Sequence, residues 1–287
     1  YLGGYDIVGI YSQEPKKKLR GMKKIETPVH KWAVSQLLPV FTPSKLDETS
    51  LKEFKSLNPD IAVLFAYGKL IPPSWLDVPL FGFVNIHASL LPRWRGAAPV
   101  QRAIENNDKL TGITIMKMNE ALDEGPIISS QKIDITNETT GKSLIDLISQ
   151  DSCSLLFNSL KNYLSGKISP KPQDNSLSNY ANKIDKEETK IDWMMSNSKL
   201  NLKIRAFYPY PSMWFMHNGI RFKVLKALLS EDEGKPGEII KKPLTIACKK
   251  GSLKIIEIQQ EGKKPLLIEK FLLGYSEFSL GTVISNG

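Results

Sequence analysis

The sequence predicts an α/β protein in which an open, mostly parallel, Rossmann-like sheet domain precedes a small C-terminal β-barrel of the OB type. Three observations support this prediction. Short apolar stretches alternate with amphipathic ones through the first half of the chain, which is typical of βαβ units. Residues 165–189 then lose this periodicity and are rich in Ser, Asn, Lys, Asp and Pro. Beyond them the stretches are short and strand-like, with Gly and Lys in the turns, as in a small barrel or sandwich.

Apolar stretches predict the strands of the first domain. DIAVLFAYG at 60–68 is almost uniformly apolar, as a central parallel strand buried on both faces would be. FGFVNIH at 81–87 repeats this pattern. The same reasoning places further strands at 5–11, 38–41, 111–118 and 126–135.

Helices are predicted where apolar residues recur at helical spacing. The helix at 27–36 begins with a Thr cap and a Pro in its first turn, which favours a helix start. The stretch 140–164 predicts a long amphipathic helix. Shorter helices are expected at 50–57 and 99–106.

The change in composition predicts the domain organisation. A catalytic domain is expected at 1–164, a linker at 165–189 and the barrel domain at 190–287, with the boundary near residue 189. Within the last segment, residues 198–215 pass from a helical pattern into a Pro-rich turn, and short strands follow.

Positive charge is concentrated in two parts of the chain. The chain has 287 residues and a formal net charge of +9. Residues 190–287 hold 16 Lys and Arg against nine Asp and Glu, a net charge of +7. The stretch KKKLRGMKK at 16–24 holds six cations and no acid. Such clusters favour a polyanion such as nucleic acid, although charge alone is equally consistent with a solvated surface.

Cysteine, histidine and hydropathy patterns exclude several classes of protein. Cys153 and Cys248 are far apart in sequence, which argues against a disulfide scaffold and favours a reducing compartment. The three histidines are too dispersed for a metal motif. No apolar run approaches the roughly 18 residues that a membrane helix needs. We therefore expect a soluble protein with no metal and no membrane contact.

The strand at 81–87 ends in polar residues that a purely structural strand does not need. Asn85 and His87 are two positions apart, so their side chains lie on one face of a strand. Ligands of open α/β sheets bind at the carboxyl ends of the strands. An amide donor and an imidazole suit the stabilisation of an oxyanion and the transfer of a proton. A hydrogen-bonded structural histidine is the alternative that the strand pattern leaves open.

A carboxylate is expected to complete this group, to orient the histidine or a water molecule. Asp123, in the loop ALDEGPII between two predicted strands, is the preferred candidate. Glu120 and Glu124 are the alternatives in the same loop. A purely structural turn residue also suits Asp123, because Glu-Gly-Pro follows it.

The stretches NIHASLLPRWRGAAPVQRAI and TGITIMKMNEALDEGPII resemble the folate-dependent formyltransferases. The Asn-x-His-x-Ser-Leu-Leu-Pro run is shared across that family. RWRGAAP, the basic loop and the C-terminal domain are similar to the members that act on initiator tRNA. FAYGKLIP, IRAFYPYP and EIQQEGKKP extend the resemblance over most of the chain.

The resemblance implies an enzyme of translation initiation, acting as a monomer. The donor would be 10-formyltetrahydrofolate, and the acceptor would be the α-amino group of methionine on initiator tRNA, with no metal involved. Asn85, His87 and Asp123 occupy the catalytic positions. The reduced folate is expected at Ser89, Leu90, Leu91 and Pro92. The tRNA acceptor end is expected at Lys16, Lys17, Lys18, Arg20, Lys23 and Lys24.

The chain departs from this family at its start. Family members open with a strand and a Gly-Thr-Pro turn before YDIVGIY, whereas this sequence starts at Tyr1. We therefore expect the first strand of the sheet to be missing. The expected location is the bacterial cytoplasm, with an organelle as the alternative because a targeting peptide could precede Tyr1.

Two other functions stay open at this point. The first is a folate-dependent formyltransferase for a small amine, such as a nucleotide sugar or a purine precursor. The second is a non-enzymatic RNA-binding protein. The basic stretch 16–24 and the C-terminal domain argue against the first function, and an intact Asn85, His87 and Asp123 argue against the second.

Overall fold

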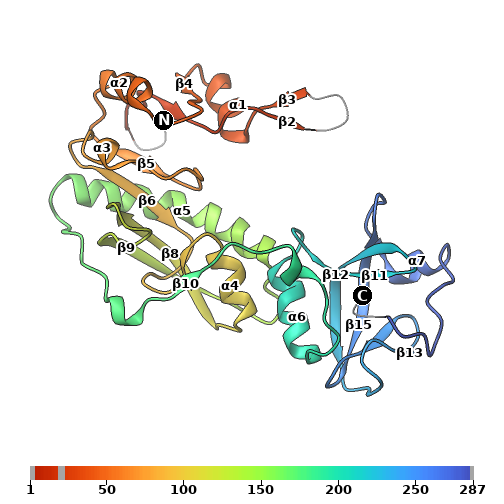
Figure 1. Cartoon of the computed structure of the whole chain (residues 1–287). Helices are drawn as coiled ribbons and strands as arrows, with labels where there is room; N and C mark the ends of the chain where they lie inside the picture. The colour runs from red at the N-terminus through yellow and green to blue at the C-terminus, as the bar shows by residue number, and fades with distance from the viewer. Residues whose placement is uncertain (1–3, 19–22, 285–287) are drawn as a thin grey trace. The chain divides into compact units, whose positions relative to one another are not determined.

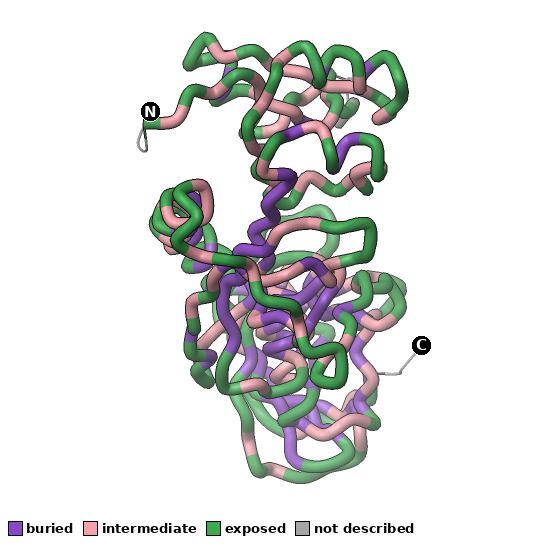
Figure 2. Tube along the Cα trace, turned by 90° about the vertical axis from the view of Figure 1, so that its left-hand side faces the viewer, coloured by how far each residue is buried: buried purple, intermediate pink, exposed green. Residues whose placement is uncertain are grey.

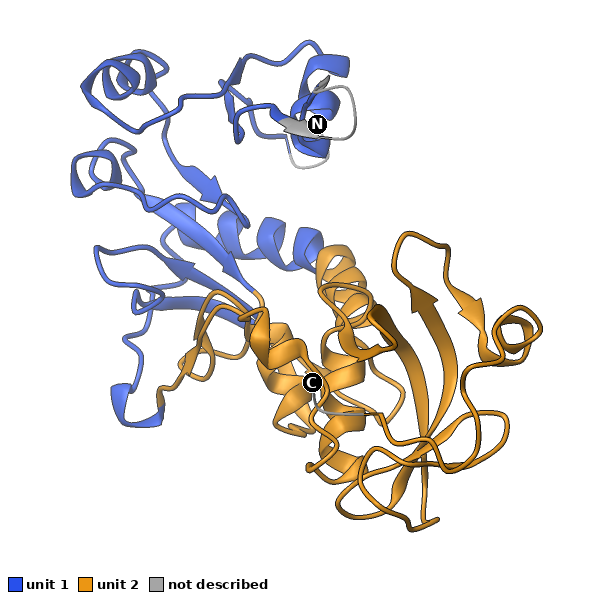
Figure 3. Ribbon diagram, turned by 45° about the vertical axis from the view of Figure 1, so that its right-hand side comes forward, with its two compact units in different colours: residues 1–87, 113–131, 152–177 blue, residues 88–112, 132–151, 178–287 orange. Residues whose placement is uncertain are grey.

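The computed structural model describes residues 4–18 and 23–284. The chain divides into two compact units that alternate along the sequence (Figure 3). Unit 1 comprises residues 1–87, 113–131 and 152–177, and unit 2 comprises 88–112, 132–151 and 178–287. The domain boundary near residue 189 stays a prediction.

The strands of the predicted α/β domain are divided between two sheets (Figure 1). Strand β1 (Ile10–Tyr11) pairs in parallel with β4 (Val40–Phe41). Strand β5 (Ala62–Leu64) pairs in parallel with β6 (Phe83–His87), and β6 pairs antiparallel with β8 (Leu110–Lys117). The second sheet has the order β5-β6-β8-β9, with β9 at Ile127–Asp134. An antiparallel strand beside parallel ones is common in such folds.

Capping residues begin two helices of unit 1, one of them at the predicted cap. Helix α1 (Pro28–Ser35) is capped by Thr27, whose Oγ1 accepts a hydrogen bond from the His30 amide at 3.1 Å. Asp47 caps α2 (Glu48–Ser56) in a capping box with Ser50. These interactions satisfy amides that have no partner within the helix. The short helix α3 (Pro73–Leu76) was not predicted, whereas the long helix α5 (Gly141–Leu164) was.

The prediction that residues 60–68 form a central strand buried on both faces is wrong for the described part of the chain. Strand β5 spans only three residues and lies at an edge of its sheet. Val63 is 45% exposed and Phe65 is 48% exposed. The stretch is apolar, but an apolar composition does not show which neighbour covers a strand.

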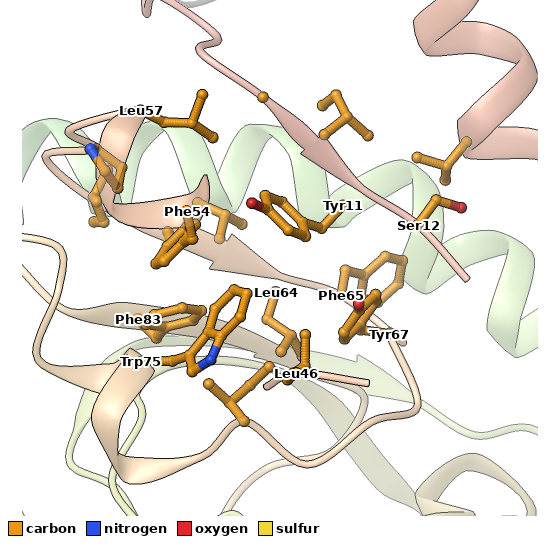
Figure 4. A pocket seen from close by; sticks show the side chains of 18 of the residues that line it. Tyr11, Ser12, Leu46, Phe54, Leu57, Leu64, Phe65, Tyr67, Trp75 and Phe83 are labelled. Carbon is orange, nitrogen blue, oxygen red and sulfur yellow. The ribbon is translucent and has the colours of Figure 1, made fainter. Parts of the chain in front are cut away.

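Strand β6 is buried along its whole length, because all five of its residues are buried. Buried and exposed segments are distinguished in Figure 2. At its start, Phe83 joins a core cluster with Phe54 of α2 and with Trp75 and Leu76 of α3. The rings of Phe54 and Trp75 are stacked, with centroids 4.8 Å apart (Figure 4). This cluster anchors the strand that ends in Asn85 and His87.

Unit 2 contains short elements within the predicted linker. Strand β10 (Tyr180–Ala181) pairs in parallel with β7 (Arg95–Gly96), which precedes α4 (Pro99–Glu105). Two 3-10 turns, η1 (Asn175–Leu177) and η2 (Glu187–Thr189), lie on either side of β10 in sequence; η1 is assigned to unit 1. The linker is therefore an ordered segment, although its composition is that of a loop.

The last part of unit 2 is an antiparallel sheet preceded by helix α6 (Asn197–Ala206). Its main path has the order β11-β12-β15-β14-β13, and β16 pairs with β15. Among the described residues, β11 and β13 do not pair with each other, so the two ends of this path stay apart in the sheet. The remaining elements are β11 (Met213–His217), β12 (Ile220–Ser230), β13 (Ile239–Lys241), β14 (Thr245–Ala247), β15 (Ser252–Gln260), β16 (Leu266–Leu267) and α7 (Ile268–Leu272).

Aromatic side chains fill the core of this antiparallel sheet. Phe222 on β12 contacts Phe215 of β11, Phe271 of α7 and Phe278, with ring centroids 5.3–5.9 Å apart. Each buried aromatic ring removes a large apolar area from water. Among the described helices, none is both long and apolar enough to cross a membrane.

Candidate active site

Strand β6 places Asn85 and His87 on the same face at its carboxyl end. Asn85 is 8% exposed and His87 is 5% exposed. They lie opposite Met116 and Thr114 of β8, which fixes the strand register at this point. A register shift of one residue would turn both side chains to the other face of the sheet.

Asp123 lies beside both of these side chains, 38 positions after Asn85 in the sequence. Asn85 Nδ2 donates to Asp123 Oδ1 at 3.4 Å, and His87 Nδ1 lies 3.5 Å from Asp123 Oδ2. The Asp123 side chain is 12% exposed. Both distances exceed those of strong hydrogen bonds, and such contacts commonly shorten when a substrate binds.

The loop that carries Asp123 is held by close backbone packing. Asp123 has a left-handed backbone conformation, with φ of 54°. A Cβ added to Gly125 would lie 1.8 Å from the carbonyl oxygen of Lys117, so only glycine fits at this position. Gln173 Nε2 donates to the carbonyl oxygens of Asp123 and Gly125, both at 2.8 Å. These contacts hold the carboxylate beside β6.

The loop that follows His87 belongs to unit 2. Two of its predicted folate-binding residues, Ser89 and Leu91, have buried side chains. Ser89 is fully buried, and its Oγ donates to the carbonyl oxygen of Arg93 at 2.6 Å. Leu91 is 7% exposed. Leu90 and Pro92, which alternate with Ser89 and Leu91 along the chain, are half-buried. The side chains of Leu90 and Pro92 are therefore the more accessible pair to a ligand.

Asp108 ties this loop to the turn after α4. Arg93 donates to both carboxylate oxygens of Asp108, at 2.9 and 2.7 Å, and Trp94 Nε1 donates to Oδ2 at 2.7 Å. The Arg93 guanidinium also lies over the Trp94 ring, 4.5 Å from its centroid. The Trp94 amide, in a left-handed conformation, donates to Asn179 Oδ1 at 2.6 Å. The indole of Trp94 is thus buried within the loop.

The basic stretch 16–24 forms a β-hairpin. Strand β2 (Lys16–Lys18) pairs antiparallel with β3 (Lys23–Ile25). Lys16 and Lys24 are exposed. Arg20 lies outside the described residues.

Comparisons with known proteins identify the family. A model described as formyl transferase matches residues 3–160, and one described as formyl transferase, C-terminal domain, matches residues 183–276. The chain belongs to the formyl transferase family. Most of unit 1, including the loop of Asp123, lies within the first match.

Two relatives of this family member carry the same name. A methionyl-tRNA formyltransferase of Paramagnetospirillum magneticum is 39% identical over 285 residues, which is 98% of this chain and 92% of that protein. A methionyl-tRNA formyltransferase of Pelagibacter ubique is 39% identical over 290 residues, or 100% and 93% of the two chains. Both alignments span the α/β sheet and the C-terminal sheet.

A solved structure in the family has a similar fold. WlaRD, a sugar 3N-formyl transferase solved in the presence of dTDP and 5-N-formyl-THF, superposes with a TM-score of 0.63. Its sequence is 16% identical to this one, and the match covers 91% of this chain and all of WlaRD. At this identity the similarity concerns the fold.

Some residues of this formyl transferase's site were not found from sequence. Gly125 has a usable signal, because Gly-Pro after an acidic residue marks a tight turn. Gln173 lies in the predicted linker, where no local pattern marks it as a site residue. Of the alternatives to Asp123, Glu120 is exposed. Within the described residues, no group of three or more His, Cys, Asp or Glu side chains forms a potential metal site.

Proposed function

We propose that this formyl transferase moves the formyl group of 10-formyltetrahydrofolate to the α-amino group of methionine on initiator tRNA, for translation initiation. The relatives named methionyl-tRNA formyltransferase support the acceptor. The related structure solved with 5-N-formyl-THF supports a folate donor. The observation that carries the chemistry is the convergence of Asn85, His87 and Asp123 in unit 1.

The first step is attack of the neutral amine on the formyl carbon. A carbon–nitrogen bond forms, and negative charge develops on the formyl oxygen. One N–H of the Asn85 amide is directed at Asp123, so the second N–H of the same group is available for this oxygen. Loss of one such donor typically costs about 3–4 kcal/mol in the barrier.

The second step transfers a proton and breaks the bond to the folate nitrogen. Asp123 faces Nδ1 of His87 and favours the tautomer with a proton on that atom. Nε2 of the neutral ring then accepts the proton that the amine loses. The resulting imidazolium is stabilised by Asp123, donates to the oxyanion and returns the proton to the leaving folate nitrogen. Proton gain and loss therefore balance.

Residues 89–92 are proposed to bind the folate. Leu90 and Pro92 would contact the flat ring system, while buried Ser89 and Leu91 keep the loop in shape. Trp94 supports the loop through Asp108.

Positive charge is proposed to bind the tRNA. The hairpin residues Lys16, Lys17, Lys18, Lys23 and Lys24, together with Arg20, and the +7 segment 190–287 are the candidates. Each neutralised phosphate makes affinity more sensitive to salt, and double-helical RNA is read largely through its backbone. We therefore expect affinity for initiator tRNA to fall steeply as salt concentration rises. We also propose the bacterial cytoplasm as the location, because the relatives are bacterial.

Formyl transfer measured with two acceptors tests this function. The full chain is given labelled 10-formyltetrahydrofolate and either methionyl initiator tRNA or free amines, including an amino sugar nucleotide. We expect kcat/KM to be higher for the tRNA by on the order of 10³-fold or more. Equal or better transfer to a free amine would support the small-amine alternative. Binding of tRNA without any transfer would support the RNA-binding alternative.

A further inference from the structure

Two residues in the loops of the proposed active site have left-handed backbones, which are uncommon for residues with a side chain. Asp123 has a φ of 54° and Trp94 has a φ of 62°. Such conformations persist only where surrounding contacts hold them, and they cluster at functional sites. Each of these residues is held by a side-chain amide of the predicted linker, Asp123 within unit 1 and Trp94 within unit 2.

Gln173 holds the loop of Asp123 by donating two hydrogen bonds. Its Nε2 donates to the carbonyl oxygens of Asp123 and Gly125, both at 2.8 Å. The backbone next to Gln173 is fixed as well, because Ile127 and Lys171 exchange two hydrogen bonds, at 2.7 and 2.8 Å. Carbonyl oxygens only accept hydrogen bonds, so the side chain at position 173 needs a donor.

Asn179 holds Trp94 by accepting a hydrogen bond. The Trp94 amide donates to Asn179 Oδ1 at 2.6 Å, and the Arg95 amide donates to the carbonyl oxygen of Asn179 at 3.0 Å. Tyr180 then pairs with Arg95 where β10 meets β7. A backbone amide only donates, so the side chain at position 179 needs an acceptor. The two linker positions therefore have opposite hydrogen-bonding requirements.

We propose that Gln173 and Asn179 are positioning residues of formyl transfer, each acting through the backbone of one loop of the site. Gln173 positions the carboxylate of Asp123, which contacts the catalytic candidates of β6. Asn179 positions the loop that carries the proposed folate residues 89–92. The proposal rests on the proposed function, because it concerns the same site. Loss of Gln173 should therefore slow the chemical step, and loss of Asn179 should weaken binding of the formyl donor.

Replacing each amide by an acid of the same shape separates this role from simple packing. In Gln173→Glu the carboxylate has no hydrogen to donate, whereas in Asn179→Asp an acceptor oxygen is kept. The measurement is steady-state formylation of methionyl initiator tRNA at varied concentrations of 10-formyltetrahydrofolate. We expect kcat to fall about 10- to 100-fold in Gln173→Glu, with KM for the donor unchanged. In Asn179→Asp both constants should stay within about twofold of the parent values.

Three further variants complete the kinetic test. Gln173→Met is uncharged and also lacks a donor, so it should show the same loss of kcat without any effect of an added charge. Asn179→Leu removes the acceptor, so KM for the donor should rise about tenfold or more while kcat changes by less than about twofold. Asp174→Asn is the matched control, because Asp174 is an exposed acid of the same segment whose side chain bonds to Ser176. It should leave both constants unchanged.

Two spectroscopic measurements need no substrate and therefore separate these roles from the proposed function. The ring ¹⁵N resonances of His87 report which nitrogen carries the proton, and Gln173→Glu should shift the neutral ring away from the tautomer protonated at Nδ1. Exchange of the Trp94 amide hydrogen should become about tenfold or more faster in Asn179→Leu and stay slow in Asn179→Asp. If both effects were present but the parent chain formylated a free amine instead of tRNA, the proposed acceptor would be wrong and the positioning roles would stand.

Several outcomes would overturn the proposal. They are a parent-like kcat in both Gln173 variants, a parent-like donor KM in Asn179→Leu, and an Asn179→Asp variant as impaired as Asn179→Leu. An equal loss in Asp174→Asn would also contradict it, because the effect would then belong to the segment in general. Unchanged His87 resonances in Gln173→Glu would show that Gln173 does not act through Asp123.

Discussion

Asp123 reaches His87 because a single residue adopts a left-handed backbone conformation in a tightly packed turn. Its φ of 54° is uncommon for a residue with a side chain, although aspartate tolerates it better than most. The two contacts at 3.4 and 3.5 Å let one carboxylate orient both an amide and an imidazole. We propose that the charge of this one group, rather than its size, matters for the chemistry of the site.

Replacing that charge tests its role. In Asp123→Asn the shape is kept but the imidazolium loses its counter-charge, so kcat should fall about 10²- to 10⁴-fold. The thermal unfolding midpoint should change little, because the side chain lies at the margin of the core. The measurement is single-turnover formylation of methionyl initiator tRNA, with the pH profile recorded for both proteins.

Glu120→Gln is the matched control, because Glu120 is an exposed acid in the same loop. It should keep full activity. A parent-like rate for Asp123→Asn, or an equal loss in Glu120→Gln, would remove the proposed role of Asp123.

At the scale of elements, the loop after β8 keeps its position by the close approach of two backbones. Gly125→Ala would bring a Cβ to 1.8 Å from the Lys117 carbonyl oxygen, which backbone movement must relieve. We expect a loss of about 3 kcal/mol or more in the free energy of unfolding, together with loss of activity. Urea denaturation measures the first and formylation measures the second.

Gly274→Ala serves as the reference substitution. Nothing lies within 4 Å of a Cβ at Gly274, so this change should alter the unfolding free energy by less than about 1 kcal/mol. If the two alanine variants were equally stable, the packing explanation for the Asp123 loop would be wrong.

A second element-scale prediction concerns the loop after β6. Asp108→Asn keeps the shape but weakens three charge-assisted or polar contacts to Arg93 and Trp94. Since this loop is the proposed folate site, KM for the formyl donor should rise about tenfold, while KM for tRNA stays constant. Asp146→Asn, in an exposed pair with Lys142, should leave both constants unchanged. If Asp108→Asn changed only the free energy of unfolding and neither KM, Asp108 would have a structural role only.

At the scale of the whole molecule, a charged network crosses the predicted domain boundary. Arg102 of α4 donates to both oxygens of Glu188, each at 2.8 Å, and to Glu105 at 2.7 Å. Lys203 of α6, which is 5% exposed, donates to Glu105 at 2.8 Å. All four residues lie in unit 2. The network links the predicted catalytic domain, linker and C-terminal domain.

This network predicts a pH dependence of stability. The hydrogen bonds from Arg102 hold the pKa of Glu188 below its usual range. A lowered carboxyl pKa contributes stability that is present above the unfolded value of about 4.3 and is lost as pH falls through the folded value. Glu188→Gln should therefore be less stable than the parent by about 1–2 kcal/mol at pH 7. The difference should shrink below about pH 4.

Chemical denaturation at pH 7 and at pH 3.5 measures this difference. Glu261→Gln is the comparison, because Glu261 pairs with Arg221 at the surface and is 57% exposed. It should change stability by less than about 0.5 kcal/mol at either pH. A pH-independent effect of Glu188→Gln would show that the pair with Arg102 contributes no ionic stabilisation.

Local patterns in the sequence were enough to predict most elements of the sheet domain, but not helix α3, and to place half of the site. The cap at Thr27 located the start of α1, and the spacing of apolar residues located α5, each within a residue or two. The period of two along a strand placed Asn85 and His87 on one face. These features depend on dihedral preferences and on the burial of neighbouring residues, which a short stretch of chain encodes.

Packing between distant segments settled what those patterns left open. The approach of Asp123 to β6, the clamp by Gln173 and the edge position of β5 join parts of the chain that are far apart in sequence. A composition such as that of residues 60–68 shows that a strand prefers to be covered, but not which segment covers it. The physical reason is that each of these contacts depends on two surfaces meeting, while a local pattern describes only one of them.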